Sequence, residues 1–362
     1  MPEVCLLCLR VSEDSYEHLM PASLGGNLEV TGLICRSCNN KYGTEIDAHL
    51  ERAFRGLNTL FNITNSRTGK LFDIVFEKDG EKLRYLRREH RITLAHPLPP
   101  DLHIRPDGSI GMHLQLPSGK AASQHQALDT ARKILVRRGL DPDGYTINNE
   151  YQEVKQGAPS VPMHLNLDVR AGSLLNRALH KIAFLSAAHL LGRDYFTAPA
   201  FDVVRRIIAG NVKSEIDFQA DCATAHTPPH HRVTLHAVDG NLSVLVALYG
   251  AFPYLIHLGP LPVGANEFRG LDFDPVHHTC SVIDSPVMAF GGPPDRQAID
   301  RALKRVLDAA MGSVQRDRLI HEALVASGIA ALTEGDTITA EHLEKMHEEL
   351  MKRLIPMIVL ED

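Results

Sequence analysis

Cys5-Leu6-Leu7-Cys8 begins the stretch of this chain that decides its fold, and Cys35-Arg36-Ser37-Cys38 closes it. Between the two cysteine pairs stand Glu17-His18-Leu19-Met20-Pro21 and Leu24-Gly25-Gly26, and the second pair runs directly into Asn39-Asn40-Lys41. Two C-x-x-C pairs supply four sulfur ligands, which is the set that tetrahedral structural zinc prefers. We therefore predict a structural zinc site made of Cys5, Cys8, Cys35 and Cys38.

A single C-x-x-C pair is also compatible with a redox-active dithiol. Two pairs that flank a compact, glycine-punctuated segment favour zinc instead, and thiols held by zinc fit a reducing compartment. The other two of the six cysteines, Cys222 and Cys280, are isolated in the sequence. We expect them to be ordinary buried cysteines.

The segment around the cysteine pairs predicts two short strands followed by a helix. Gly25-Gly26-Asn27 is a turn signal, and residues 28–34 are short and partly β-branched, as in a strand. From Asn39 onward, apolar residues recur at roughly helical spacing. These residues are Ile46, Leu50, Ala53, Phe54 and Leu57.

Residues from about 3 to 50 resemble the HNH endonuclease family in its zinc-stapled, four-cysteine form. The resemblance rests on Glu-His-x-x-Pro followed by Leu-Gly-Gly, and on a second cysteine pair that leads into Asn-Asn-Lys. It implies a ββα-metal finger and the metal-dependent hydrolysis of DNA phosphodiester bonds. It also implies that His18 is the general base and that Glu17 and Asn39 hold the catalytic ion.

The chemistry of phosphodiester hydrolysis suits these residue types. A water must lose its proton beside the phosphorus, which a histidine that is neutral near pH 7 can accept. Carboxylate and amide oxygens suit Mg²⁺ or Mn²⁺, and a site with two protein ligands leaves room for water and phosphate. The middle residue of the family motif is ambiguous here, and Asn27 is the candidate for a supporting role beside His18.

Glu17 and His18 are neighbours, which has a geometric consequence. Adjacent side chains on a strand point to opposite faces, so both can serve one site only where the strand bends or ends. Pro21 favours a strand that ends quickly.

A non-catalytic zinc module that grips nucleic acid or a partner protein is the competing interpretation. In that case Glu17-His18 would be a solvated turn and Asn39 a helix cap. The presence of Glu17, His18 and Asn39 together favours the nuclease. An active site elsewhere in the chain is less favoured, because the remainder has no glycine-rich phosphate loop or recognisable nucleophile motif.

The formal net charge of −6 argues against nucleic-acid binding by the chain as a whole. Residues 51–140, however, contain 16 Lys or Arg against 9 Asp or Glu. We therefore place the DNA-binding surface on the nuclease-like segment at about residues 3–50, called the cassette below, and on the segment that follows it. The predicted contact residues are Arg36, Lys41, Arg84, Arg87, Arg88 and Arg91.

The rest of the chain predicts an α+β protein in which a mixed body follows the finger. The expected division is a nuclease finger at 1–57, a basic α+β segment at 58–157 and a C-terminal α+β domain at 158–362. Turn signals and apolar periodicity predict a hairpin at 71–86, a strand at 110–116 and strands at 232–236, 242–248 and 254–257. Helices are predicted at 123–138, 173–191, 199–209, 294–310, 316–326 and 339–354.

Proteins of this architecture resemble bacterial restriction or phage-defence effectors, whose body senses a modified base or a regulatory ligand. A single cassette cuts one strand, so a double-strand break needs a homodimer or two successive nicks. No signal pattern precedes the first cysteine pair, and no apolar run reaches the length of a membrane span. We expect a soluble cytoplasmic protein.

Overall fold

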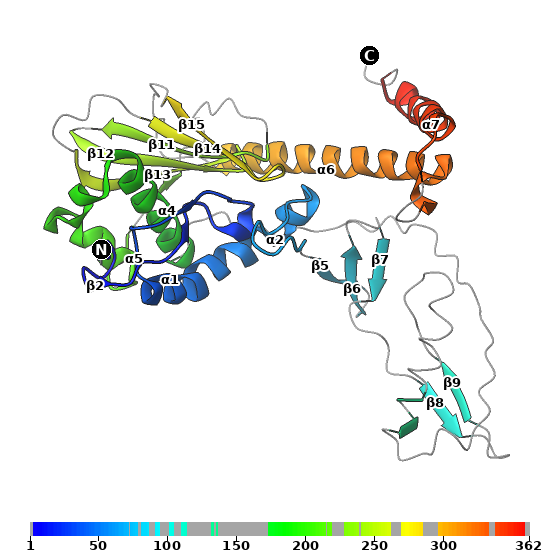
Figure 1. Ribbon diagram of the computed structural model, residues 1–362, viewed down its shortest axis with the longest axis horizontal. Coiled ribbons are helices and arrows are strands. Elements are labelled where there is room, and N and C mark those ends of the chain that lie inside the picture. The colour runs from blue at the N-terminus through cyan, green and yellow to red at the C-terminus, as the bar shows by residue number, and fades with distance from the viewer. Residues whose placement is uncertain are drawn as a thin grey trace. The chain divides into compact units, whose positions relative to one another are not determined.

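A computed structural model describes most of the chain in two compact units (Figure 1). One unit joins Met1–Phe72 to Leu165–Asp362, and the other is Asp73–His164. The described residues are 3–71, 73–78, 81–86, 91–94, 101–104, 110–113, 132–133, 135–136, 173–214, 216–218, 228–238, 240–261, 269–284, 296–332 and 337–358. The division at residues 57 and 157 stays a prediction.

The N-terminal residues form the expected ββα arrangement. Strand β3 (Glu17–His18) pairs antiparallel with β4 (Glu29–Val30), so that Glu17 faces Val30 in register and His18 faces Glu29. A shorter pair, β1 (Glu3–Val4) and β2 (Val11–Ser12), brackets the first cysteine pair. Gly25 ends the one-turn helix η1 (Ala22–Leu24) at a φ of 80°, a left-handed conformation that glycine adopts without strain.

Three helical segments run on from the second cysteine pair. They are α1 (Arg36–Tyr42), the π-helical turn η2 (Gly43–Asp47) and α2 (Ala48–Leu60). Four of the five residues of the predicted apolar stripe, Ile46, Leu50, Phe54 and Leu57, are at most 1% exposed, and Ala53 is half-buried. A π-helical turn widens the helix locally and changes the direction of its side chains.

The C-terminal part of the same unit is built on a six-stranded sheet. Its antiparallel order is β10-β13-β12-β11-β14-β15. The strands are β10 (Asp217–Phe218), β11 (His231–Val238), β12 (Asn241–Leu248), β13 (Phe252–Pro260), β14 (Arg269–Asp274) and β15 (Thr279–Asp284). Helix α4 (Ser173–Leu191) contacts both this sheet and the η2–α2 segment (Figure 1).

Shorter elements and two further helices complete this unit. The turns η5 (Arg193–Thr197) and η6 (Pro199–Phe201) lead into α5 (Asp202–Ile208). Helix α6 (Arg296–Ser327) is followed by the turn η7 (Ile329–Ala331) and by α7 (Ala340–Ile358), which packs on α6. Phe184, Phe196 and Phe201, each fully buried, form an aromatic cluster between α4 and these turns.

The ββα cassette packs into the core of the C-terminal part. Phe54 on α2 lies 5.3 Å from the ring of Tyr249, measured between centroids. The Tyr249 hydroxyl donates to Asn58 Oδ1 at 2.6 Å, and the Asn58 amide donates to the Ser23 carbonyl at 2.8 Å. Asn58 and Tyr249 are fully buried, so each polar group needs its partner. The cassette and the sheet therefore share one continuous core.

The described residues of the other unit form two antiparallel β-structures. One is the sheet β5 (Ile74–Lys78), β6 (Glu81–Leu86) and β7 (Arg91–Leu94), and its first two strands confirm the predicted hairpin. The other pairs β8 (Asp101–Ile104) with β9 (Ile110–His113), which confirms the start of the strand predicted at 110–116. Most of the helix predicted at 123–138 lies outside the described residues.

One prediction about the body is wrong, and two strands were not predicted. The helices predicted at 294–310 and 316–326 are one helix, α6, because Gly312 costs a helix interior only about 1 kcal/mol and no proline breaks it. Strands β14 and β15 were not predicted. His231 begins β11 and is fully buried.

The burial of His231 predicts that the folded state loses stability in acid. The Tyr249 N–H donates to its Nδ1 at 3.0 Å, so the ring proton is on Nε2, which donates to the Leu24 carbonyl at 3.1 Å. Burial lowers the pKa of His231 to about 3. In the unfolded chain His231 binds a proton near pH 6.5, whereas in the folded chain it stays neutral until about pH 3. The folded state therefore loses stability as the pH falls from about 6.5 towards 3.

Urea unfolding at several pH values checks this expectation. The unfolding free energy of the wild type falls as the pH is lowered. In His231→Gln the slope of this decrease should be smaller by about 1.4 kcal/mol per pH unit, and this comparison of slopes does not depend on the variant's absolute stability. His347→Gln on the exposed side of α7 is the control, because that side chain is exposed in the folded state as well. An unchanged slope in His231→Gln contradicts the assignment.

Candidate metal centre and active site

The four predicted zinc ligands converge in the structure. The Sγ atoms of Cys5, Cys8, Cys35 and Cys38 all lie within 4.8 Å of one another, and Cys8 Sγ is 3.9 Å from Cys35 Sγ. Four sulfurs about 2.3 Å from a tetrahedral zinc ion are separated by nearly this distance. Hydrogen bonding between Cys5 and Cys38 lowers the pKa of Cys5 to about 4 and raises the pKa of Cys38. The cluster fits a structural zinc ion.

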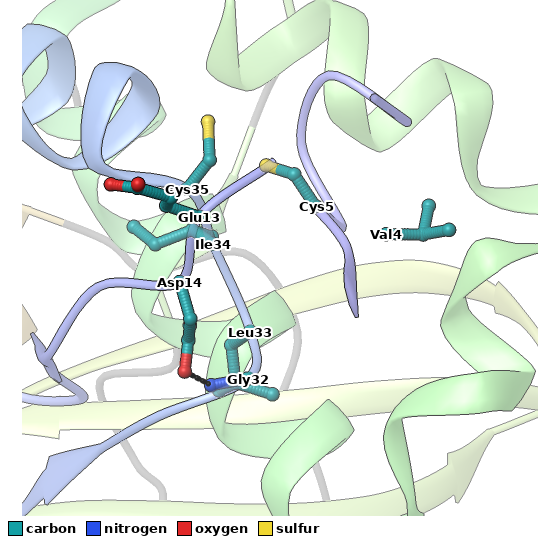
Figure 2. Close-up of a pocket in the computed structure, with 8 residues that line it drawn as sticks. All are labelled: Val4, Cys5, Glu13, Asp14, Gly32, Leu33, Ile34 and Cys35. Atoms are coloured by element: carbon teal, nitrogen blue, oxygen red, sulfur yellow. Dashed lines mark hydrogen bonds between the residues drawn. The ribbon is translucent and has the colours of Figure 1, made fainter. Parts of the chain in front are cut away.

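Two arginines from the C-terminal part hold the first cysteine pair in place. Arg205 on α5 donates to the Leu6 carbonyl at 2.8 Å, and Arg193 donates to the Val4 carbonyl. A shallow pocket lies beside Cys5 and Cys35, where Asp14 accepts a hydrogen bond from the Gly32 N–H at 2.6 Å (Figure 2). These contacts fix the backbone around the cysteine cluster.

His18 is the centre of the candidate active site. Its side chain is largely buried, its Nε2 is 3.3 Å from Glu29 Oε1, and its Nδ1 is 3.2 Å from an Arg67 guanidinium nitrogen. Since Arg67 can only donate, Nδ1 is the acceptor and Nε2 carries the proton that faces Glu29. Burial lowers the pKa of His18; the Arg67 charge acts in the same direction, and Glu29 opposes it. The neutral form of the ring is therefore favoured, with Nδ1 as its proton acceptor.

Arg67 reaches His18 from a well-braced turn after α2. Asn65 Oδ1 accepts hydrogen bonds from the Arg67 N–H at 3.0 Å and the Thr68 N–H at 3.1 Å. Ser66 binds the cassette through its N–H, which donates to the Ala22 carbonyl at 3.0 Å, and through its hydroxyl, which donates to the Gly26 carbonyl. The exposed Arg67 guanidinium is thus held beside the histidine.

Glu17 points into a buried ionic cluster. Its Oε1 is 2.7 Å from Lys181 Nζ on α4, and the same ammonium is 2.6 Å from Asp47 Oδ2 at the end of η2. Glu17 is 3% exposed. Burial raises its pKa and the neighbouring Asp47 adds to this effect, while the Lys181 charge opposes it. A carboxylate suits a divalent ion, but here it is paired with an ammonium.

The two asparagines make different contacts. The Asn39 amide, on α1, donates to the Tyr16 carbonyl at 2.6 Å and to Ser15 Oγ at 2.8 Å, just before β3. The Asn39 amide oxygen makes no hydrogen bond with the described residues. Asn27 donates to the His278 carbonyl. The side chain that contacts His18 from the second strand is Glu29.

The predicted DNA-contact residues fall into three groups. Arg36 and Lys41 are exposed on α1, with Lys41 Nζ 5.3 Å from the Tyr42 ring centroid. Arg84 on β6 pairs with Asp73 at 3.6 Å, and Arg91 lies on β7. Arg87 and Arg88 lie outside the described residues.

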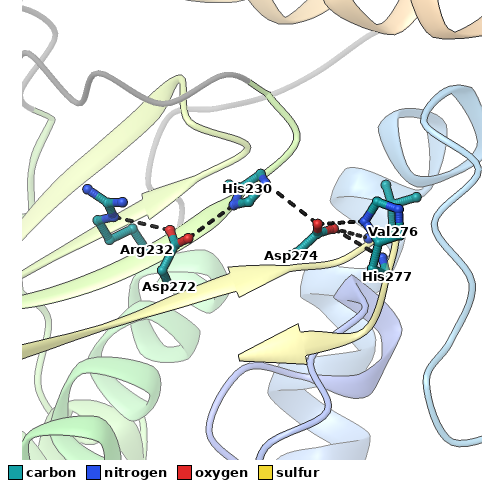
Figure 3. Close-up of polar contacts among 6 residues, drawn as sticks. All are labelled: His230, Arg232, Asp272, Asp274, Val276 and His277. Carbon is teal, nitrogen blue, oxygen red and sulfur yellow. Dashed lines mark hydrogen bonds and ion pairs between the residues drawn. The ribbon is translucent and has the colours of Figure 1, made fainter. Parts of the chain in front are cut away.

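A histidine-rich turn of the sheet supports the Gly25-Gly26 turn of the cassette. Asp274 accepts hydrogen bonds from the Val276 and His277 N–H groups, and His230 lies between Asp272 and Asp274 (Figure 3). His278 in this turn bonds Thr64 Oγ1 at 2.8 Å and the Gly25 carbonyl at 3.2 Å. Among the described residues, only the four cysteines are grouped as metal ligands would be.

The comparisons with known proteins agree with the cassette's geometry. Residues 5–55 match the family model of the HNH endonucleases. This match, with the clustered cysteines, confirms the family resemblance of the N-terminal segment and supports a nuclease-type function that acts on nucleic acid. No curated protein and no solved structure matches the chain. Within the described residues, no helix is long and apolar enough to cross a membrane.

Four residues of the site were not predicted from the sequence. They are Glu29, Asp47, Arg67 and Lys181. The sequence contains a pattern that could have identified Glu29, because a strand that returns from a Gly-Gly turn places its residues opposite those of the first strand. Arg67 and Lys181 lie beyond the matched residues, and only the tertiary packing brings them to β3.

Proposed function

We propose that this protein is a metal-dependent endonuclease that hydrolyses DNA phosphodiester bonds, with His18 as the general base. The observation that supports it most is the setting of His18, a neutral imidazole between Glu29 and Arg67 inside a zinc-framed ββα cassette. A binding module needs no such basic histidine.

His18 Nδ1 is the atom that accepts the proton from the attacking water. The proton on Nε2 is held by Glu29 at 3.3 Å, which fixes the tautomer and stabilises the imidazolium that forms. Arg67 occupies Nδ1 in the resting site. A phosphate is a stronger partner for a guanidinium than a neutral imidazole is, so substrate draws Arg67 away and frees the base.

Glu17 and Asn39 would hold the divalent ion, through a carboxylate oxygen and an amide oxygen. The donor types fit Mg²⁺ or Mn²⁺, and the Asn39 oxygen has no hydrogen bond to the described residues. When bound, such an ion stabilises charge on the phosphate and on the leaving 3′ oxygen. Glu17 becomes a ligand only when Lys181 releases it.

Arg67→Ala is expected to reduce kcat/KM for DNA cleavage by about 100-fold, because the phosphate loses a charged donor beside the base. Arg67→Lys keeps the charge and loses less. Steady-state cleavage of a labelled duplex measures both, with Arg55→Ala on α2 as the control. Equal kcat/KM in Arg67→Ala and the wild type contradicts the phosphate contact.

The function itself is tested with covalently closed circular DNA and the purified, zinc-loaded protein. Conversion to open circles in Mg²⁺ or Mn²⁺, and none in EDTA, is the expected result, and the new ends carry a 5′-phosphate and a 3′-hydroxyl. Conversion that persists in EDTA, or none with either ion, contradicts the proposal.

A further inference from the structure

Lys181 stands out as a buried cation from outside the matched residues that reaches the first strand of the nuclease cassette. Its ammonium contacts Glu17 at 2.7 Å and Asp47 at 2.6 Å, and its side chain is 3% exposed. Burying an ammonium is costly unless it is paired, so these two contacts fix the position of Lys181 firmly.

The helix that carries Lys181 is aligned with the π-helical turn of the cassette. Arg177, one helical turn before Lys181 on α4, pairs with Glu45 at 3.0 Å, as Lys181 pairs with Asp47. Glu45 and Asp47 both lie on η2, which directs them towards α4. The contact between α4 and η2 thus includes a pair of matched ionic bonds, and of these two cations Lys181 also pairs with Glu17 on β3.

The charges within the cluster are incompletely balanced. Two carboxylates and one ammonium leave one negative charge, and Asp47 Oδ1 is buried without a hydrogen-bond partner among the described residues. A divalent ion would balance both carboxylates, and carboxylate oxygens are its preferred ligands. An ammonium at this position therefore occupies a place that a divalent cation can take.

We propose that Lys181 sets the metal affinity of the nuclease site by competing with the divalent ion for Glu17. The inference rests on the proposed function, in which Glu17 is a ligand of that ion. Because Lys181 belongs to α4, a residue outside the cassette determines how readily Glu17 is available to the ion.

Two variants that move the metal affinity in opposite directions test this competition. Lys181→Gln combined with Asp47→Asn keeps the cluster at one negative charge, so Glu17 is freed without adding unbalanced charge. Lys181→Arg keeps the cation and grips the carboxylate with two donors. Asp47→Asn alone is the matched control for the double variant. Circular dichroism and zinc content establish that each protein is folded.

The test measures Mn²⁺ binding to the zinc-loaded proteins. The electron paramagnetic resonance signal of free Mn²⁺ reports how much of the ion remains unbound. The Kd for Mn²⁺ is expected to be at least tenfold lower in the double variant than in Asp47→Asn. It is expected to be higher in Lys181→Arg than in the wild type. Adding Glu17→Gln to the double variant is expected to abolish Mn²⁺ binding. An unchanged Kd in both Lys181 variants, or binding that survives Glu17→Gln, overturns the proposal. Binding is measured without DNA, so a failure of DNA cleavage is distinguished from a failure of the competition.

Discussion

Replacing His18 with alanine is expected to abolish DNA cleavage while the protein stays folded and zinc-loaded. In the proposed mechanism the imidazole is the neutral base of the site, with Nδ1 as proton acceptor and Glu29 beside Nε2. General-base catalysis contributes typically 10²- to 10⁴-fold, so a loss of about 10³-fold in the single-turnover rate is expected. Quenched-flow cleavage of a labelled duplex in Mg²⁺ measures this rate.

His49→Ala on α2 is the matched control, since it removes an imidazole from the same cassette without touching the site. Zinc content and thermal unfolding of the two variants separate a catalytic loss from a folding defect. A His18→Ala rate within threefold of the wild type contradicts the role of His18 as general base.

Loss of the zinc ligands is expected to have the second large effect, on folding. Strands β1 to β4 each contain two residues, and such short pairs contribute little stability alone. Structural zinc sites contribute on the order of 10 kcal/mol to the folding of small modules. Cys35→Ser therefore loses zinc, unfolds the cassette and abolishes cleavage.

Calorimetry and zinc content of Cys35→Ser measure this effect. Cys280→Ser is its control, because Cys280 lies on β15, far along the chain from the cluster, and should retain zinc and the wild-type Tm. The contacts of Arg193 and Arg205 link the cluster to the body, so the Tm of the whole unit should fall as well. Unchanged Tm and zinc content in Cys35→Ser contradict the four-cysteine site.

The sequence predicted the cassette well because its determinants are local. C-x-x-C spacing, the Gly-Gly turn and a helical apolar stripe each act within a few residues, and the structure places them as expected. Helix α4 was predicted with its correct ends for the same reason. The prediction of two helices in place of α6 is wrong because a single glycine only weakly destabilises a long helix whose apolar residues recur at helical spacing.

The environment of the site could not be predicted, because it depends on packing between distant segments. The Lys181 contact with Glu17 and the His278 contact with Gly25 join the cassette to parts of the chain far away in sequence. On sequence alone Lys181 is one lysine in an apolar helix, and burial between two carboxylates is a tertiary property. Alternation along a strand limits how Glu17 and His18 can share one site, and their contacts in the structure differ, but alternation does not identify the partner of either side chain.

Nicking of one supercoiled plasmid preparation by zinc-loaded wild type, His49→Ala and His18→Ala, side by side in Mg²⁺, is the most direct test of the account. Open circles from the first two proteins and none from His18→Ala are the predicted result. Equal nicking by all three proteins, or none by the wild type in Mg²⁺ and Mn²⁺, contradicts a His18-dependent endonuclease.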